Sequence, residues 1–307
     1  MTQTVKASTF KKLISQKYLQ LMVLPGVIWM LIFNYIPMTG IVIAFKNFKI
    51  TKPIAEAPWV GLEHFIEFFS DPNFVNIMTN TLGISLLKLL IGFPLPILFA
   101  ILLNEVRNAR FKKTVQTVSY LPHFISWVVL GGLMITWLNE TGMINEILVK
   151  FGLLDKPIAF LADPKYFWGL TVISDTWKEL GWSAIIYLAA ISGIDQQMYE
   201  AATVDGATKI QKIMKITLPA IKGTIAIMFI LAVANMLSSN FDQIFILKNV
   251  LNTSSSEVID TYVYQMGMRA GRYSYATAIG LFKSVIAMIL LLTANFTTKK
   301  LQGRSLF

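Results

Sequence analysis

The stretch EAATVDGATKIQKIMKITLP, Glu200–Pro219, is a polar, lysine-bearing segment between two long apolar runs of the 307-residue chain. It shows no arrangement of catalytic residues and no cluster of metal ligands. Its role therefore depends on whether the flanking apolar runs span a membrane, and on which face of that membrane the segment lies.

The composition of the chain is typical of a membrane protein. It is 55% hydrophobic and 14% charged, whereas soluble domains carry about 25% charged residues. A membrane-spanning helix needs about 20 apolar residues. Six runs are long enough, and they lack the alternation of barrel strands. We therefore expect an all-α membrane protein with six transmembrane helices, near residues 19–45, 77–103, 115–138, 167–191, 223–247 and 276–298.

Lysine and arginine in the connecting segments predict the orientation of the spans. With the N-terminus inside, the inner segments hold fifteen basic and four acidic residues, and the outer segments hold nine basic residues and a slight excess of acidic ones. Both termini are then cytoplasmic, and Glu200–Pro219 lies on the inner side. The first apolar run is longer than a signal peptide's and lacks a convincing cleavage site, so we expect it to be a retained span.

The predicted spans divide the chain into four parts. Residues 1–18 form a cytoplasmic tail, 19–76 the first span with a long outer loop, 77–298 a core of five spans, and 299–307 a second cytoplasmic tail. The core contains the inner loop 193–222. In the outer loop, the amphipathic stretch Leu62–Phe69 either lies on the membrane surface or belongs to a packed cap.

The inner loop has the local pattern of a helix, a turn and a second helix. Tyr199 to Val204 predicts a short helix, with a carboxylate near its N-terminal end, where the helix dipole favours it. Asp205-Gly206 predicts a turn, because glycine adopts a positive φ without strain. Ala207 to Ile216 predicts a second helix, ended by Thr217-Leu218-Pro219. Proline then opens the fifth span.

Several classes of function lack support in the sequence. There is no GxxxxGK[ST] motif, so the chain has no phosphate cradle and is not expected to hydrolyse ATP itself. There is no HExxH or GxSxG motif and no cysteine, and we predict neither an enzyme nor a metal site. The net charge of +10 is spread over the segments between spans, which argues against nucleic-acid binding.

The inner loop resembles the conserved cytoplasmic loop of ABC importer permeases. In that family Glu-Ala-Ala is followed after three residues by Gly, and later by Ile-x-Leu-Pro. The matching residues here are Glu200, Ala201, Ala202, Gly206, Ile216, Leu218 and Pro219. The strings Trp177-Lys-Glu-x-Gly-Trp182 and Tyr187-Leu-Ala-Ala are similar to those of the carbohydrate branch, particularly permeases for polysaccharide or oligosaccharide uptake. The resemblance covers residues 77–298 most strongly.

The resemblance implies a subunit of a binding-protein-dependent sugar importer in the bacterial cytoplasmic membrane. A second permease subunit, expected to be a related chain in a heterodimer, would complete the pathway. Two ATPase subunits would bind ATP and Mg²⁺, so this chain would carry no cofactor, and an extracytoplasmic sugar-binding protein would deliver substrate. The residues expected to couple to the ATPase are Tyr199, Glu200, Ala201, Ala202, Asp205, Gly206, Ala207, Ile216, Leu218 and Pro219.

Polar residues inside spans are costly in lipid and usually face a cavity or one another. Candidates for the substrate pathway are Asp175, Trp177 and Glu179 in the fourth span, and Asn235, Ser239, Asn240 and Asp242 in the fifth. Packing between helices is the alternative for both groups. Lys88 and Lys283 suit an anionic sugar such as a uronate. Pairing with Asp175, Glu179 or Asp242 explains these lysines at least as well.

Two other functions remain as alternatives to a sugar permease. An ABC importer for another class of solute would share the inner loop. An ion-coupled secondary transporter would instead show an inverted repeat or a pair of interrupted spans in matching positions, and we find neither in the sequence.

Overall fold

The computed structural model describes residues 16–238 and 240–302, and these residues are almost entirely helical. The elements in chain order are α2 (Lys17–Met30), η1 (Leu31–Tyr35), α3 (Ile36–Met38), η2 (Thr39–Phe45), η3 (Ile54–Glu56), α4 (Glu63–Phe69), α5 (Phe74–Leu87), η4 (Lys88–Gly92), α6 (Pro94–Asn104), α7 (Ala109–Tyr120), η5 (Leu121–Phe124), α8 (Trp127–Trp137), α9 (Met143–Lys150), α10 (Pro164–Ser192), α11 (Gln196–Val204), α12 (Lys209–Lys212), η6 (Ile213–Thr217), α13 (Leu218–Ala234), α14 (Phe241–Leu247), α15 (Thr253–Ser256), α16 (Ile259–Tyr264), η7 (Gln265–Arg269) and α17 (Tyr273–Gln302).

Four continuous helices are long and apolar enough to cross a membrane: Lys17–Phe45, Phe74–Asn104, Lys209–Ala234 and Tyr273–Lys300. Three of them contain the first, second and sixth predicted spans. The fourth predicted span is the single helix α10, which is about 44 Å long at 1.5 Å per residue. Charged residues interrupt its apolar sequence, and α10 packs against α6, α7 and α13, which shield much of its surface.

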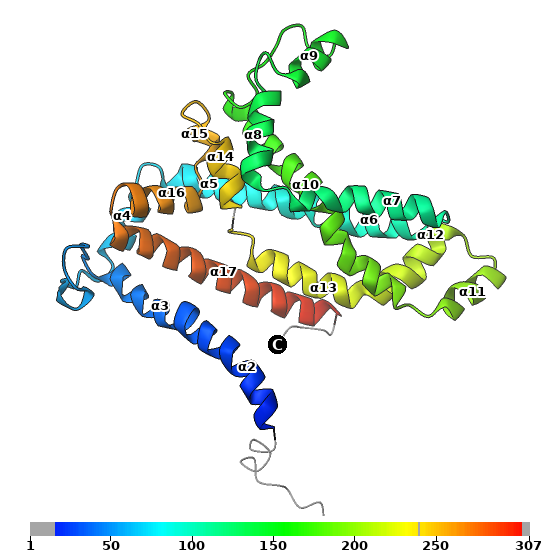
Figure 1. Ribbon diagram of the computed structural model, residues 1–307, viewed down its shortest axis with the longest axis horizontal. Coiled ribbons are helices and arrows are strands. Elements are labelled where there is room, and N and C mark those ends of the chain that lie inside the picture. The colour runs from blue at the N-terminus through cyan, green and yellow to red at the C-terminus, as the bar shows by residue number, and fades with distance from the viewer. Residues whose placement is uncertain (1–15, 239, 303–307) are drawn as a thin grey trace, which may run out of the picture.

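The third predicted span, 115–138, is not one continuous helix. α7 and η5 run to Phe124, and α8 then leaves at an angle of 96°. Ile125 is extended, which breaks the helix, and the side chain of Ser126 accepts a hydrogen bond from the backbone N–H of Val129 at 3.3 Å to start α8. α8 therefore stands out from the bundle, with α9 beyond it (Figure 1).

The fifth predicted span, 223–247, is not one continuous helix either. α13 ends at Ala234, and α14 starts only at Phe241. Asn240, just before α14, has a φ of +33° and is the only non-glycine residue with a positive φ in 16–238 and 240–302. Asparagine tolerates this region better than most residues. The break thus coincides with a polar stretch of the sequence, NMLSSN at 235–240.

The start of the fifth span differs from the prediction as well. Thr217-Leu218-Pro219 does not end the preceding helix, because α12, η6 and α13 continue into one another. η6 is a π-helical turn directly before Pro219. Proline lacks the N–H that would bond four residues back, and the wider turn lets the helix pass through it. π-turns precede Pro37 and Pro94 in the same way.

The predicted amphipathic stretch of the first outer loop is α4, and it packs against the rest of the chain. Phe68 is buried in a cluster with residues of α5, α16 and α17. Beside it, Asp71 accepts hydrogen bonds from the hydroxyl groups of Tyr262 and Tyr275 and from the backbone N–H of Asn73. Burial alone would raise the pKa of Asp71, but these hydrogen bonds outweigh it and lower the pKa. The resulting stabilisation is present above the pKa of the unfolded chain and is lost as the pH falls through the folded value.

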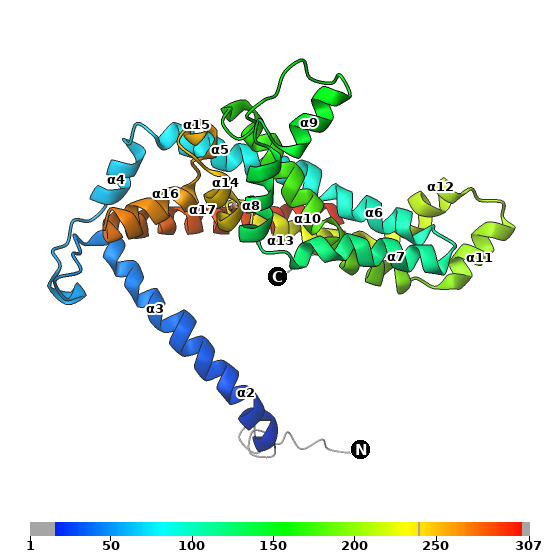
Figure 2. The same cartoon turned by 45° about the horizontal axis from the view of Figure 1, so that its top comes forward.

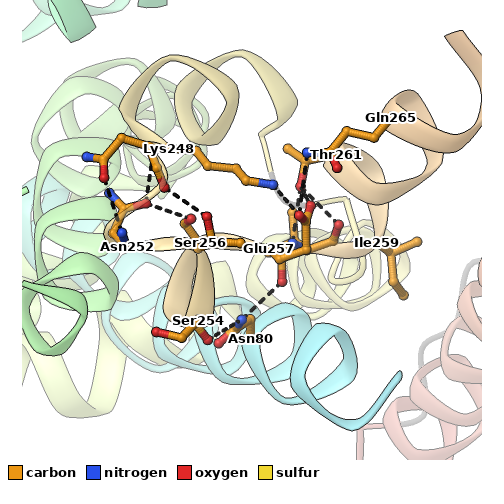
Figure 3. Close-up of polar contacts among 12 residues, drawn as sticks. Asn80, Lys248, Asn252, Ser254, Ser256, Glu257, Ile259, Thr261 and Gln265 are labelled. Carbon is orange, nitrogen blue, oxygen red and sulfur yellow. Dashed lines mark hydrogen bonds and ion pairs between the residues drawn. The ribbon is translucent and has the colours of Figure 1, made fainter. Parts of the chain in front are cut away.

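A polar cluster fixes the segment between α14 and α16 (Figure 3). Lys248 and Glu257 form an ion pair whose side chains are only 12% and 9% exposed. The hydroxyl group of Thr261 donates to Glu257 at 2.7 Å. Asn80 of α5 donates to the backbone oxygens of Ser254 and Glu257, both at 3.0 Å. The cluster therefore joins α5 to a segment about 170 residues later in the chain.

We expect Lys248→Met to destabilise the protein by about 3–5 kcal/mol, because it leaves Glu257 buried without its partner. The double variant Lys248→Met/Glu257→Gln should recover most of that loss, since an amide at 257 still accepts from Thr261 without carrying a charge. Thermal unfolding of the purified protein in detergent measures both. Equal unfolding temperatures for the single and double variants would contradict a buried-charge effect.

The two ends of the molecule are formed by different segments. Figures 1 and 2 both place α11 and α12 at one end, and α4 and α16 at the opposite end. α6, α10 and α13 run between these ends, and α17 packs along α13. Four clusters of buried apolar side chains, distributed along this bundle, make up its core.

Candidate functional site

The segment of α11 and α12 is a rigid exposed unit at the end of the bundle. The side chain of Asp195 caps α11 by accepting from the backbone N–H of Gln197 at 2.9 Å. At its other end, Gly206 has a φ of +74°, its N–H bonds the oxygen of Thr203 at 3.1 Å, and the next N–H bonds that of Ala202 at 2.9 Å. This hydrogen-bond pattern is a Schellman motif. The predicted short helix is present, but it begins at Gln196, three residues earlier than predicted, so Glu200 lies outside its first turn. The positive φ at the turn is present.

The second helix of the unit starts at Lys209, two residues later than predicted. Thr208 and Gln211 form a capping box: the Thr208 N–H donates to the Gln211 side chain at 2.7 Å, and the Gln211 N–H donates to the Thr208 hydroxyl group at 3.3 Å. The turn between α11 and α12 is therefore fixed from both sides.

Two side-chain contacts connect α11 to the following helix. The hydroxyl groups of Tyr199 and Thr217 are 2.9 Å apart, and Lys212 donates to the hydroxyl group of Thr203 at 2.6 Å. Nevertheless α11 has no buried residue. Val204 is 89% exposed, and Met198, Ile210 and Met214 are exposed as well. The unit thus presents an apolar surface that its own chain leaves uncovered.

The ten predicted coupling residues lie on this unit, on η6 and on the start of α13. Glu200, Ala201, Asp205, Gly206 and Pro219 are exposed, and the other five are half-buried. Leu218 packs against the core cluster formed by α6, α10 and α13. The segment therefore joins an exposed helix directly to a long helix of the bundle.

A cavity of about 380 Å³ lies between α5–α6, α10 and the C-terminal half of α13. Of the predicted substrate residues, Asp175, Glu179 and Asn235 line it. Lys88 also lines it, and its Nζ lies 3.2 Å from Asp175 Oδ2. Ser85, Thr176, Ser183 and Ser238 add hydroxyl groups to the wall. The cavity thus combines alcohols, an amide and carboxylates, which are groups that bind sugar hydroxyls.

The break between α13 and α14 is attached to this cavity. Asn240 Nδ2 donates to Asp175 Oδ1 at 2.9 Å. Gln243 is completely buried and accepts from Lys88 Nζ at 3.0 Å. Its own amide donates to the oxygen of Thr171 at 2.8 Å and to a second α10 residue, Ser174, at 2.9 Å. Sequence reasoning missed Gln243, although its position three residues after Asn240 places both on one face of α14.

A second polar group lies at the bend between η5 and α8. Lys178 is buried and donates to Glu179 at 3.0 Å and to the backbone oxygen of His123 at 2.8 Å. His123 Nδ1 contacts the other oxygen of Glu179 at 2.7 Å, and its ring stacks on Trp182 at 4.3 Å. His123 is therefore more than the helix-entry residue that its position suggested: it connects the bend to α10.

Three predicted substrate residues lie elsewhere or cannot be placed. Trp177 is 52% exposed on α10, and Asp242 is exposed on α14; neither lines the cavity. Ser239 lies outside the described residues. Lys283 forms an ion pair with Asp260, which is none of the three partners considered for it. Within the described ranges, no group of three or more His, Asp or Glu residues could hold a metal ion.

The family model named "Binding-protein-dependent transport system inner membrane component" matches residues 92–303, which is well over half of the chain. The chain is 48% identical over 290 residues to the polygalacturonan/rhamnogalacturonan transport system permease protein YteP of Bacillus subtilis (strain 168), covering 94% of this chain and 90% of YteP.

Two crystal structures of bacterial alginate ABC transporters contain a similar chain. One is of a transporter involved in the import of the acidic polysaccharide alginate, with a TM-score of 0.88, 40% identity, and coverage of 95% of this chain and 99% of that one. The other is of a transporter in complex with an alginate pentasaccharide-bound periplasmic protein, with a TM-score of 0.89, 39% identity, and coverage of 97% and 99%. The similarity extends over nearly the whole chain.

Proposed function

Because the chain belongs to the family of inner membrane components of binding-protein-dependent transport systems, we propose that it is a permease subunit of an ATP-driven importer of oligosaccharides. It forms half of the translocation pathway, with both termini in the cytoplasm. The high identity to a polygalacturonan/rhamnogalacturonan permease carries this proposal. Since polygalacturonan and alginate are both built from uronic acids, acidic oligosaccharides are the first substrates to test.

The exposed unit of α11 and α12 is the proposed contact with a separate ATPase. It has an uncovered apolar surface, a fixed turn and a continuous connection through η6 into α13. α13 lines the cavity, so a displacement of α11 would reach the pathway through one helix. The unit also lies at the end of the molecule opposite α4 and α16, as expected if it is cytoplasmic and they face outward (Figure 2).

The proposed partners are a second permease chain, two ATPase subunits that bind ATP and Mg²⁺, and an extracytoplasmic sugar-binding protein. The apolar helix Lys17–Phe45 supports contacts with lipid or a second permease, because most of its side chains are exposed. The related transporter crystallised with a saccharide-bound periplasmic protein supports the third partner.

Reconstitution in proteoliposomes tests the proposal. With its ATPase, second permease and binding protein, the chain should drive uptake of oligogalacturonides only when ATP is present on the ATPase side. Omitting this chain should abolish uptake and the substrate stimulation of ATP hydrolysis. Uptake that needs an ion gradient and persists without ATP would contradict the proposal and support a secondary transporter. ATP-driven uptake of a different class of solute would support the role as a permease subunit but contradict the proposed substrate.

A further inference from the structure

Lys88 of η4 and Asp175 of α10 form an ion pair on the wall of the cavity. Their Nζ and Oδ2 atoms are 3.2 Å apart, and the two side chains are 18% and 21% exposed. Both residues line the cavity. A charged pair that only joined two helices could be covered by apolar side chains, whereas this pair remains accessible from the space between the helices.

The pair has hydrogen-bonding capacity left over. A lysine ammonium group has three N–H donors. The described acceptors of Lys88 are Asp175 Oδ2 and Gln243 Oε1, so one donor remains. A carboxylate offers about four lone-pair sites, and the described donors to Asp175 are Lys88 and Asn240. A free donor and free acceptor sites therefore lie next to each other on the cavity wall.

The surrounding contacts hold this pair in one position. Gln243 cannot turn away from Lys88 without losing its bonds to Thr171 and Ser174. Asn240, in its uncommon backbone conformation, holds the other oxygen of Asp175. Polar groups that are oriented before a ligand arrives bind it with a smaller entropic cost.

The charges of the wall are balanced. Lys88 is the single basic residue among the described residues that line the cavity. The two acidic residues of the lining are Asp175, which pairs with Lys88, and Glu179, which pairs with Lys178 at 3.0 Å. No positive charge is left to bind a substrate carboxylate, and a carboxylate beside Lys88 would also lie close to Asp175.

We propose that Lys88 and Asp175 form a binding site for two neighbouring hydroxyl groups of a saccharide. One hydroxyl group accepts from Lys88, and the other donates to Asp175. The site recognises sugars through hydroxyl groups and does not select between acidic and neutral ones, so recognition of substrate charge lies outside this cavity. The inference rests on the proposed function, because it takes the cavity to be part of the translocation pathway.

Two saccharide probes and three variants test the site. The probes are trigalacturonate and its fully methyl-esterified, neutral form, and the measurement is equilibrium binding to the assembled permease–ATPase complex in nanodiscs without binding protein. Lys88→Gln/Asp175→Asn removes both charges but keeps a donor and an acceptor. Lys88→Met/Asp175→Leu removes both charges and also the hydrogen-bond donor and acceptor. Asp175→Asn alone leaves the lysine charge unbalanced.

In the wild-type complex, the two probes should bind with dissociation constants within about threefold of each other. Lys88→Gln/Asp175→Asn should change either constant by less than about threefold. Asp175→Asn alone leaves the ammonium charge of Lys88 unbalanced, so it should tighten binding of the acidic probe and leave that of the neutral probe within about threefold. Lys88→Met/Asp175→Leu should weaken binding of both probes at least tenfold. Monodisperse elution and a wild-type unfolding temperature establish that each variant is folded. If the apolar variant does not fold, the other two still decide the question.

Different results would overturn the inference. A tenfold loss for the acidic probe alone in Lys88→Gln/Asp175→Asn would make Lys88 a carboxylate ligand in the wild-type complex. Unchanged binding in Lys88→Met/Asp175→Leu would make the pair purely structural, and failure of the wild-type complex to bind either probe would remove the site. ATP-driven uptake by the wild-type complex is measured separately, so failure of the proposed function is distinguishable from each of these results.

Discussion

Gly206→Val should reduce ATP-driven uptake and substrate-stimulated ATP hydrolysis at least tenfold, while the chain still inserts and assembles. Gly206 has a φ of +74° in the motif that ends α11. A side chain in this region costs about 1–2 kcal/mol, and a β-branched one fits it least well. A strain of 1.4 kcal/mol shifts the equilibrium between the native turn and a relaxed turn about tenfold toward the relaxed one. In the relaxed conformation α11 would be displaced.

The fold as a whole should survive this substitution. A Cβ at position 206 meets nothing within 4 Å, and α11 buries no residue. The change therefore acts on the direction of α11 and leaves the core intact. Uptake and ATP hydrolysis by the reconstituted complex measure the effect, and the yield of monodisperse complex shows that assembly is unaffected.

Two controls separate coupling from backbone strain. Gly61→Val introduces the same strain, because Gly61 has a φ of +61° and open space around its Cβ position, but it lies in the loop before α4 at the opposite end of the molecule. It should change coupling by less than about threefold. Gly206→Asn should also lose less, since asparagine tolerates a positive φ. If Gly61→Val impaired coupling as strongly as Gly206→Val, the coupling role of the α11 turn would be rejected.

Features determined by neighbouring residues were predicted correctly. The end of the helix at Val204 and the turn at Gly206 depend on a glycine a few positions away, whereas the start of the helix, at Gln196, lies three residues before the predicted one. The long helices at the first, second and sixth predicted spans follow from apolar length alone. These parts of the fold need no information about distant contacts.

The breaks in the third and fifth spans were not predicted, although polar residues at 235–240 mark the second break. The apolar sequence continues through Ile125, and only tertiary contacts show where each helix stops. At the second break, Asn240 is held by Asp175, a residue 65 positions earlier. The backbone conformation of Asn240 depends on this distant contact. The sequence alone does not show the contact, so it does not show where the helix stops.

The composition of the candidate site was predicted better than its connections. Asp175, Glu179 and Asn235 were identified because polar residues in spans usually face a cavity. The same rule also selected Trp177 and Asp242, which do not line the cavity, since it cannot say which face of a helix is covered. Lys88 and Gln243, which form a hydrogen bond, are 155 residues apart in the sequence. Such pairings follow from helix packing, which the sequence alone does not provide.

Gly181→Ala should destabilise the protein by about 3 kcal/mol, which is at the upper end of the usual cost of overpacking a core. Gly181 lies where α10 crosses α7. A Cβ there would come within 2.1 Å of the backbone oxygen of Ser119 and 2.4 Å of its carbonyl carbon. Backbone atoms cannot rotate away as a side chain can, so the two helices would have to separate. Close approach through glycine is a common way to pack helices in membranes.

Gly169→Ala provides the matched control on the same helix. A Cβ at 169 meets nothing within 4 Å, and replacing glycine by alanine inside a helix stabilises it by about 0.5–1 kcal/mol. The two substitutions add the same methyl group to α10 but should shift the unfolding temperature of the purified protein in opposite directions. Because the α7–α10 crossing also positions His123 against Glu179, separation of these helices would open the bend before α8. A similar unfolding temperature for both variants would mean that α7 does not pack on α10 as closely as Ser119 and Gly181 indicate.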